Sequence, residues 1–199
     1  MRAAVLAGGH ASRFGGAPKG LEAVGGERIL DLVVQAVHGA LGEMPLLVAN
    51  DPAAKQWRKG LDVVPDAIPE SGSLGGIYTA LISGQGPVLV VAWDMPFVTV
   101  ELLTALVAGA SGHDAFLPES TGPKGVEPLC AVYGPGCREP IRAQIETEDF
   151  RTTAFHDQVK VGTLSLDRVQ ALGEPETLFC NVNAPEDLPA AEALWRARR

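Results

Sequence analysis

Residues 2–20 read RAAVLAGGHASRFGGAPKG, a short apolar run that breaks into a glycine-rich loop carrying Arg13 and Lys19. The run Arg2–Leu6 predicts a buried strand, and the glycines after it let the backbone approach a ligand closely. Such a loop can direct N–H groups at phosphate oxygens, and the two cations add positive charge. The stretch therefore predicts a first strand followed by a phosphate-binding loop, with a flexible surface turn as the alternative.

Two familiar phosphate-binding motifs are excluded. The chain has no Gly-x-Gly-x-x-Gly run, so the fingerprint of dinucleotide-binding folds is missing. A Walker loop would need Gly at position 18 and Ser or Thr at position 20, where the chain has Pro18 and Gly20. The loop belongs to neither class.

Strands and helices alternate along the first half of the chain. Short apolar runs predict strands at residues 2–6, 45–49, 62–64 and 88–92, and helical spacing of apolar residues predicts helices at 29–41 and 74–82. Asp51 is expected to begin a short helix and Thr99 to cap another. This alternation predicts a parallel sheet built from βαβ units.

The second half is less regular. Strands are expected at residues 114–117, 127–133 and 159–166, and helices at 136–146 and 185–199. Residues 111–124 are polar and rich in Pro and Gly, which predicts a long loop over a pocket.

Composition narrows the class of protein. The 199 residues, 46% of them apolar, fit one globular domain. A net charge of −8 argues against non-specific binding of nucleic acid, and no apolar run approaches the roughly 18 residues of a membrane span. The three cysteines lack Cys-x-x-Cys spacing and the four histidines are scattered. We therefore expect a cytoplasmic protein without a zinc site, a membrane contact or a nucleic-acid partner.

Polar residues follow the expected strands, where an open parallel sheet binds ligands. Asn50, Asp66 and Asp94 hold such positions. Asp94 follows the most apolar strand, and a carboxylate there suits Mg²⁺ bound jointly with phosphates; the alternative is a helix N-cap or a plain loop acid. The turn at residues 70–76 leads into a helix and either faces an anion or is an ordinary helix entry.

The first loop, continued as Lys19-Gly20-Leu21, resembles the signature of the molybdenum cofactor guanylyltransferases, within the Rossmann-like nucleotidyltransferases. The resemblance covers most of the chain. It implies an α/β fold: a Rossmann-like three-layer sandwich with a mostly parallel central sheet, as in nucleotide-diphospho-sugar transferases. Further matching motifs follow in the family's order: VPD at 64–66, SLGG at 73–76, DMPF at 94–97, EPL at 127–129 and NVNAPEDL at 181–188.

The resemblance also implies an activity. The family transfers GMP from GTP to the terminal phosphate of molybdopterin, releases pyrophosphate and uses Mg²⁺. Lys19, Arg13 and the loop amides would stabilise the transition state, and Asp94 would bind Mg²⁺. The remaining expected contacts are Leu6, Ala7 and Gly8 along the nucleotide, Lys19 at its phosphates, Asn50 and Asp66 at the base and ribose, and Asn181 and Asn183 near the pterin or the metal.

Three positions depart from the family's pattern. Trp93 stands where relatives usually carry Cys, and Ser73 where Pro is common. Both flank motif residues, so they bear on the shape of the pocket rather than on its chemistry. Pro18 replaces the usual Asp before the loop lysine, so any role of that acid is absent.

The order of the motifs suggests a division of one domain, residues 1–199. Residues 1–95 would bind the nucleotide and 96–199 the acceptor, with Lys124 as an anion contact or a solvated loop charge. Other readings stay open: a cytidylyltransferase for the same cofactor, a sugar-phosphate or phospholactate transferase, an inactive regulatory module, or an adaptor that delivers the cofactor to a molybdoenzyme. Lys19-Gly20-Leu21 and residues 181–188 favour the guanylyl branch.

Overall fold

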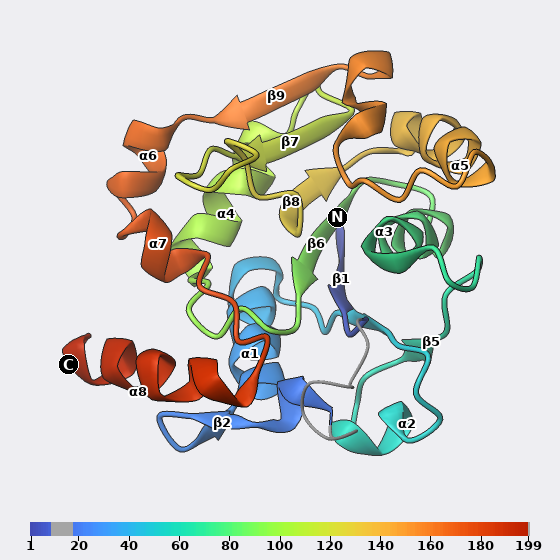
Figure 1. Ribbon diagram of the computed structural model, residues 1–199. Coiled ribbons are helices and arrows are strands. Elements are labelled where there is room, and N and C mark those ends of the chain that lie inside the picture. The colour runs from blue at the N-terminus through green and yellow to red at the C-terminus, as the bar shows by residue number, and fades with distance from the viewer. Residues whose placement is uncertain (9–17, 199) are drawn as a thin grey trace.

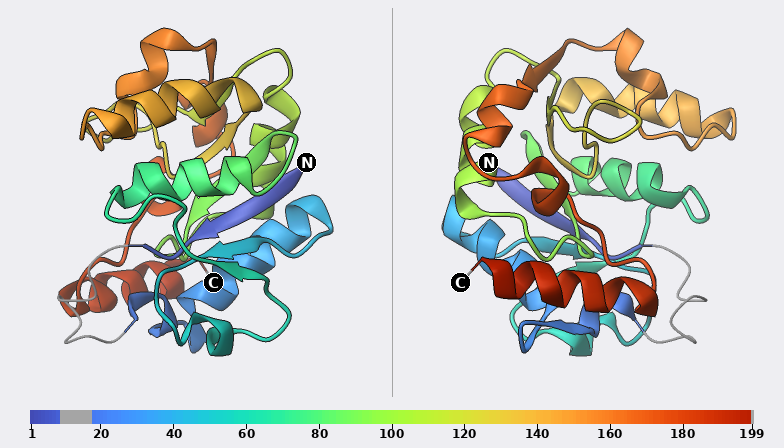
Figure 2. Two further views of the ribbon diagram at one scale, coloured as in Figure 1. Left: turned by 90° about the vertical axis from the view of Figure 1, so that its right-hand side faces the viewer. Right: turned by 60° about the vertical axis from the view of Figure 1, so that its left-hand side comes forward.

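The computed structural model describes residues 1–8 and 18–198, so the expected loop cation Arg13 lies outside the described residues. A seven-stranded sheet with the order β5-β4-β1-β6-β8-β7-β9 has helices packed on both faces (Figures 1 and 2). This confirms the expected three-layer α/β fold. The strands are β1 (Arg2–Leu6), β4 (Leu46–Val48), β5 (Val63–Val64), β6 (Val88–Ala92), β7 (Ala115–Pro118), β8 (Cys130–Tyr133) and β9 (Val161–Leu164).

The sheet is mostly parallel. β1 lies between β4 and β6 and is parallel to both, and β4 is parallel to β5. β8 runs antiparallel to its neighbours β6 and β7, while β9 is parallel to β7. The carboxyl ends of β1, β4, β5 and β6 therefore meet at one edge, where the expected ligand contacts follow.

Each face of the sheet has its own core. In β1, Ala3 and Val5 join the core beneath α1 (Ile29–Leu41) and α4 (Val100–Gly109). Ala4 and Leu6 join the core beneath α3 (Gly72–Ile82) and α5 (Arg138–Glu146). Because both faces are covered, every residue of the central strand β6 is buried, which explains its unbroken apolar run.

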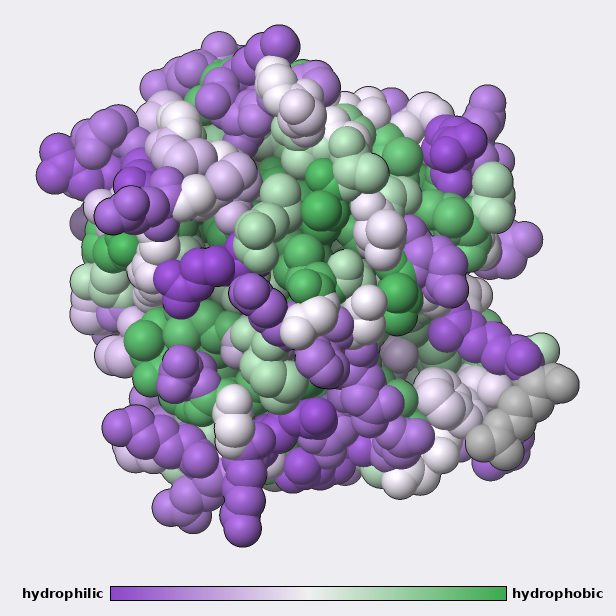
Figure 3. Space-filling view, turned by 180° about the vertical axis from the view of Figure 1, so that it is seen from behind, coloured by the Kyte–Doolittle hydropathy of each residue, from purple (hydrophilic) through white to green (hydrophobic). Residues whose placement is uncertain are grey.

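The helix ends follow local signals. The Thr99 hydroxyl accepts a hydrogen bond from the N–H of Leu102 at 3.2 Å, so the expected N-cap of α4 is confirmed. α1 ends at Gly42, whose φ of 73° is costly for residues with a Cβ. The short helix expected at Asp51 is α2 (Ala54–Trp57), but Asp51 as its N-cap is wrong: the N-cap is Ala53, and Oδ1 of Asp51 accepts from the Ala53 N–H at 2.7 Å in the preceding turn. Both α1 and α4 lie toward the side shown in Figure 3, where apolar groups gather near the centre among polar ones.

Several short elements were not expected from the sequence. They are the hairpin of β2 (Ala23–Val24) and β3 (Glu27–Arg28), the helices α6 (Leu166–Gln170) and α7 (Pro175–Leu178), and the 3-10 turns η2 (Lys19–Leu21) and η4 (Ala154–Gln158). Two further 3-10 turns, η3 (Pro135–Cys137) and η5 (Pro185–Asp187), begin the helical segments expected at 136–146 and 185–199. The final helix, α8, covers Leu188–Ala197 and packs on the β2–β3 hairpin.

Two expectations for the second half are wrong in part. Residues 111–124 are not one loop, because β7 occupies their middle, pairs with β8 and β9, and buries Phe116 and Leu117 in the cores on opposite faces of the sheet. The last strand stops at Leu164, since Leu166 already begins α6. Within the described residues, no helix is both long enough and apolar enough to cross a bilayer.

Candidate active site

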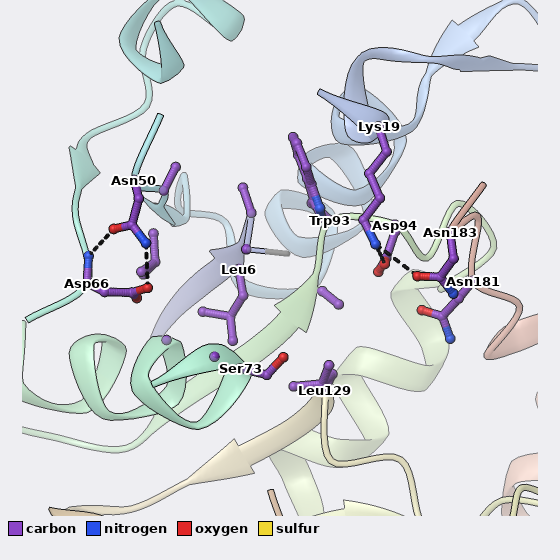
Figure 4. Close-up of a pocket in the computed structure, with 17 residues that line it drawn as sticks. Leu6, Lys19, Asn50, Asp66, Ser73, Trp93, Asp94, Leu129, Asn181 and Asn183 are labelled. Carbon is purple, nitrogen blue, oxygen red and sulfur yellow. Dashed lines mark hydrogen bonds and ion pairs between the residues drawn. The ribbon is translucent and has the colours of Figure 1, made fainter. Parts of the chain in front are cut away.

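A cavity of about 350 Å³ opens at the carboxyl ends of β1, β4 and β6 (Figure 4). This is the range of volumes typical of small-molecule sites. The residues that follow these strands form its floor, and the first turn of α3 forms one wall. Its lining comprises Leu6, Ala7, Gly8, Lys19, Val48, Ala49, Asn50, Asp66, Gly72, Ser73, Gly76, Ala92, Trp93, Asp94, Leu129, Asn181 and Asn183.

The floor is held by backbone contacts between neighbouring strands. The N–H of Ala7 donates to the carbonyl of Val48 at 2.8 Å, which extends the β1–β4 pairing beyond β1. Helix α3 approaches β1 closely at Gly76, where a Cβ would lie 3.2 Å from a methyl carbon of Leu6. The N-terminal turn of α3 therefore reaches the cavity, as the alternative of an anion-facing turn requires.

One end of the cavity joins three residues from distant parts of the sequence. The Lys19 ammonium, carried by η2, forms an ion pair with Oδ2 of Asp94 and donates to Oδ1 of Asn183 at 2.9 Å. Asp94 is buried, with 7% of its surface exposed. The partly buried ion pair places a positive and a negative group side by side at this end of the cavity.

The structure permits a test of whether this end could hold a divalent metal. Oδ1 of Asp94 is buried and has no hydrogen-bond partner among the described residues. Carboxylate and carboxamide oxygens are ligands that Mg²⁺ accepts. In residues 1–8 and 18–198, no group of three or more His, Cys, Asp or Glu side chains could enclose a metal. Asp94 therefore fits a Mg²⁺ ion that takes its other ligands from substrate phosphates and water.

The other end of the cavity holds a second polar pair. Nδ2 of Asn50 donates to Oδ2 of Asp66 at 2.7 Å, and Oδ1 of Asn50 accepts from the Asp66 N–H at 2.8 Å. Burial raises the pKa of the Asp66 carboxyl, and the hydrogen bond from Asn50 opposes that rise. In Figure 4 this pair lies across the cavity from Lys19, Asp94 and Asn183, with Leu6 and Trp93 between.

The segment that follows α7 is tied to the first half of the chain. The N–H of Val182 donates to the carbonyl of Asp94 at 2.9 Å, so Asn181 and Asn183 are both brought to the cavity. Nδ2 of Asn181 donates to the carbonyl of Phe179 at 3.0 Å. Oδ2 of Asp187 accepts from the N–H of Asn183 at 2.7 Å and closes the turn.

Lys124 does not join these residues. It is exposed, does not line the cavity, and its ammonium donates to the Thr152 hydroxyl at 3.0 Å. The alternative of a loop charge outside the site fits this position. The nearby carboxyl of Glu127 has a raised pKa, chiefly because of burial, while the N–H of Leu129 opposes the rise.

Sequence reasoning found most of the cavity but not all of it. Leu6, Ala7, Gly8, Lys19, Asn50, Asp66, Asp94, Asn181 and Asn183 all line it, whereas Lys124 does not. Ser73 and Gly76 belong to the glycine-rich turn for which two readings stayed open. Trp93 was noted only as a departure from a pattern, and its strand-end position was the signal that could have placed it in the wall.

The chain is similar to known protein sequences over nearly its full length. The model of the MobA-like NTP transferase domain matches residues 3–160. A probable molybdenum cofactor guanylyltransferase of Pelotomaculum thermopropionicum is 33% identical over 96% of this chain and 91% of its own. The molybdenum cofactor guanylyltransferase of Desulfosudis oleivorans is 33% identical over 98% of this chain and 96% of its own.

Solved structures agree with this grouping. The molybdopterin-guanine dinucleotide biosynthesis protein A of Archaeoglobus fulgidus superposes with a TM-score of 0.82 at 25% identity, covering 99% of this chain and 100% of its own. The 4-diphosphocytidyl-2C-methyl-D-erythritol synthase of Anaerococcus prevotii, at 15% identity and a TM-score of 0.69 over 98% and 95% of the two chains, shares the fold. The chain therefore belongs to the molybdenum cofactor guanylyltransferases of the MobA-like NTP transferase family and is a nucleotidyltransferase.

Proposed function

We propose that this enzyme transfers GMP from GTP to the terminal phosphate of molybdopterin, with Mg²⁺, and releases pyrophosphate. The observation that carries the proposal is the cavity with two unlike ends, Lys19 with Asp94 at one and Asn50 with Asp66 at the other. A nucleoside triphosphate has the same polarity, with charged phosphates at one end and a hydrogen-bonding base at the other. The relatives' names supply the choice of guanine and of the acceptor.

The base end supports a preference for guanine. Guanine presents two adjacent donors, N1–H and the N2 amino group, and a carboxylate can accept both. Asn50 fixes the Asp66 carboxylate by bonding to one of its oxygens and to its backbone N–H. Cytosine presents an acceptor beside its amino group, so it would place a lone pair against the same carboxylate.

The phosphate end supports charge neutralisation as the main catalytic task. A divalent metal held by Asp94 would offset the negative charge on the phosphates when bound. Lys19 supplies a fixed positive charge beside it, placed to stabilise the charge that develops on the leaving pyrophosphate. The attacking phosphate is largely ionised at neutral pH, so no side chain has to act as nucleophile or to remove a proton.

The acceptor is assigned to the side of the cavity formed by Asn181, Asn183 and Leu129. These residues come from the second half of the chain, as the division at residue 95 anticipates.

The free thiols of Cys130, Cys137 and Cys180 suit the reducing cytoplasm, where we place the reaction. A molybdoenzyme or a cofactor-delivery protein as partner stays a prediction.

A nucleotide screen tests the proposal. GTP, CTP, ATP and UTP are offered in turn with molybdopterin, with and without Mg²⁺, and pyrophosphate release is measured. We expect release with GTP and Mg²⁺ only, and loss of the Mg²⁺ response in Asp94→Asn, which keeps the shape but not the charge. Faster release with CTP would assign the chain to cytidylyl transfer. No release with any nucleotide would favour an inactive nucleotide-binding module.

A further inference from the structure

Trp93 occupies the wall between the two ends of the cavity. It follows β6, directly precedes Asp94, and has only 4% of its surface exposed. Its ring stacks on that of Trp57 from α2, with centroids 5.1 Å apart and planes at 20°. The N–H of Trp93 donates to the carbonyl of Leu6 at 3.1 Å, which fixes its backbone to β1. Trp57 therefore holds the indole by stacking, and the hydrogen bond to Leu6 holds the backbone of Trp93.

The benzene part of the indole also lies against η2. A Cβ built at Gly20 would lie 2.3 Å from Cε3 of Trp93 and 2.6 Å from its Cδ2, far inside contact distance. Gly20 itself is buried. Because Gly20 has no side chain, the backbone of η2 can contact the ring directly.

This contact involves the sequence neighbours of the ion pair. Lys19 directly precedes Gly20, and Asp94 directly follows Trp93, so the indole contacts the backbone next to the ammonium and is itself next to the carboxylate. Pro18, at the N-terminal end of the turn, provides no side-chain cap. The turn is instead held by packing, on α1 and on the indole.

We infer that Trp93 is a positioning residue: its indole, stacked on Trp57 and in contact with the backbone of Gly20, sets the place of Lys19 relative to Asp94. The inference rests on the proposed transfer for its kinetic consequence, but not for the geometry. A displacement of about 1 Å in such a site can cost about 100-fold in rate. Replacing the indole by a smaller side chain, or adding a methyl group at Gly20, would produce such a displacement.

The test uses the full chain in five forms: wild type, Trp93→Leu, Trp93→Phe, Gly20→Ala and the double variant of Trp93→Leu with Gly20→Ala. We expect Trp93→Leu and Gly20→Ala each to lower kcat by about 10–100-fold. Trp93→Phe keeps a flat ring for the stack and should recover most of this loss. In the double variant the added methyl no longer meets the indole, so its loss should not exceed that of Trp93→Leu.

A stability control separates positioning from packing. Phe155→Leu also removes a fully buried aromatic ring, but from the core beneath α3 and α5 and outside the cavity. It should lower Tm as Trp93→Leu does while leaving kcat at the wild-type level. If Trp93→Leu behaves in the same way, or if the losses of Trp93→Leu and Gly20→Ala multiply in the double variant, the inference is overturned.

A second measurement needs no substrate. The rate at which acetic anhydride modifies Lys19 is followed by mass spectrometry, with exposed Lys124 as the internal reference. Because the ion pair with Asp94 protects the ammonium, Trp93→Leu and Gly20→Ala should speed modification several-fold and Trp93→Phe should not. Unchanged protection in the first two variants refutes the positioning role. Absence of wild-type turnover together with altered protection refutes only the proposed transfer.

Discussion

Lys19 connects the signature loop to two residues far along the chain, Asp94 and Asn183. The sequence predicts each of the two residues of the ion pair in the site separately. Lys19 lies in the glycine-rich loop, and Asp94 follows an expected strand. That the two would form an ion pair could not be predicted, since the pairing depends on how η2 turns back over the end of β6. The Lys19 ammonium is therefore the group whose removal tests the catalytic role of this cluster most directly.

Removing that ammonium should slow turnover without unfolding the protein. We expect Lys19→Ala to lower pyrophosphate release by about 10²–10³, the scale for losing one donor that stabilises a developing anion. Lys124→Ala is the matched control, because it removes a lysine that lies outside the cavity. Wild-type turnover in Lys19→Ala, or equal losses in the two variants, would rule out this role.

The half-buried carboxyl of Asp66 predicts a pH dependence of GTP binding. Burial raises its pKa, so on acidification the carboxylate takes up a proton at a higher pH than an ordinary aspartate, and the protonated form loses an acceptor for the base. GTP affinity should therefore fall as the pH drops toward this raised pKa. Calorimetric titration with GTP over a range of pH measures this fall in wild type and in Asp66→Asn. Protonation of the GTP phosphates affects both proteins equally, so the same pH dependence of affinity in both would contradict the assignment.

The element that joins the two halves of the site is the segment from α7 to η5. It carries Asn181 and Asn183 to the cavity by the bond from the Val182 N–H to the Asp94 carbonyl. Asn183 also contacts Lys19, whereas Asn181 bonds back to Phe179. Of the two, Asn181 is therefore the cleaner probe of the acceptor.

Asn181→Ala should raise the KM for molybdopterin about tenfold, the scale of one lost hydrogen bond to a charged group. The Kd for GTP should stay near the wild-type value, because this side chain hydrogen-bonds to the Phe179 carbonyl and not to Lys19 or Asp66. Separate titration of each substrate distinguishes the two effects. A loss confined to GTP would reverse the assignment of the two halves.

The β2–β3 hairpin is fastened by the last helix, and this fixes the segment that follows Lys19. Gly25 has a φ of 63°, its N–H donates to Glu192 of α8 at 2.7 Å, and a Cβ there would lie 2.0 Å from the ring of Trp195. Gly26 has a similar φ of 85°, but a Cβ there would have no described neighbour within 4 Å.

Gly25→Ala should therefore destabilise the fold more than Gly26→Ala. Both changes strain a left-handed backbone, but only the first also forces a methyl group into packed atoms, at an added cost of about 1–3 kcal/mol. Urea unfolding of the two variants beside wild type gives the difference. Equal free energies of unfolding would mean that α8 does not clamp the hairpin.

The elements that could be predicted are those whose signal is local. α1, α4 and β6 follow from apolar spacing, a Thr cap and an unbroken apolar run. The β2–β3 hairpin escaped prediction because strands of two residues have no periodicity, and its turn is built on Gly25 and Gly26. The antiparallel direction of β8 is set by its pairing with β6 and β7, and the residues of β8 carry no local signal of that direction.

At the scale of the molecule, the site belongs to neither half alone. Most lining residues precede position 95, yet Leu129, Asn181 and Asn183 come from beyond it. β8, from the second half, also lies directly beside the central strand β6. The two substrate halves therefore stay a prediction about contacts, and they do not correspond to two separately folded parts.

The order of strands in the sheet has a consequence for synthesis on the ribosome. When the segment through α4 has emerged, β5, β4, β1 and β6 can pair, but β6 is then an apolar edge without its neighbour β8. An open edge of this kind invites pairing with another chain. The edge of β6 in the nascent enzyme stays unpaired until residues 130–133 have been synthesised. The hydrogen bond from Lys19 to Asn183 can form only when translation is nearly complete.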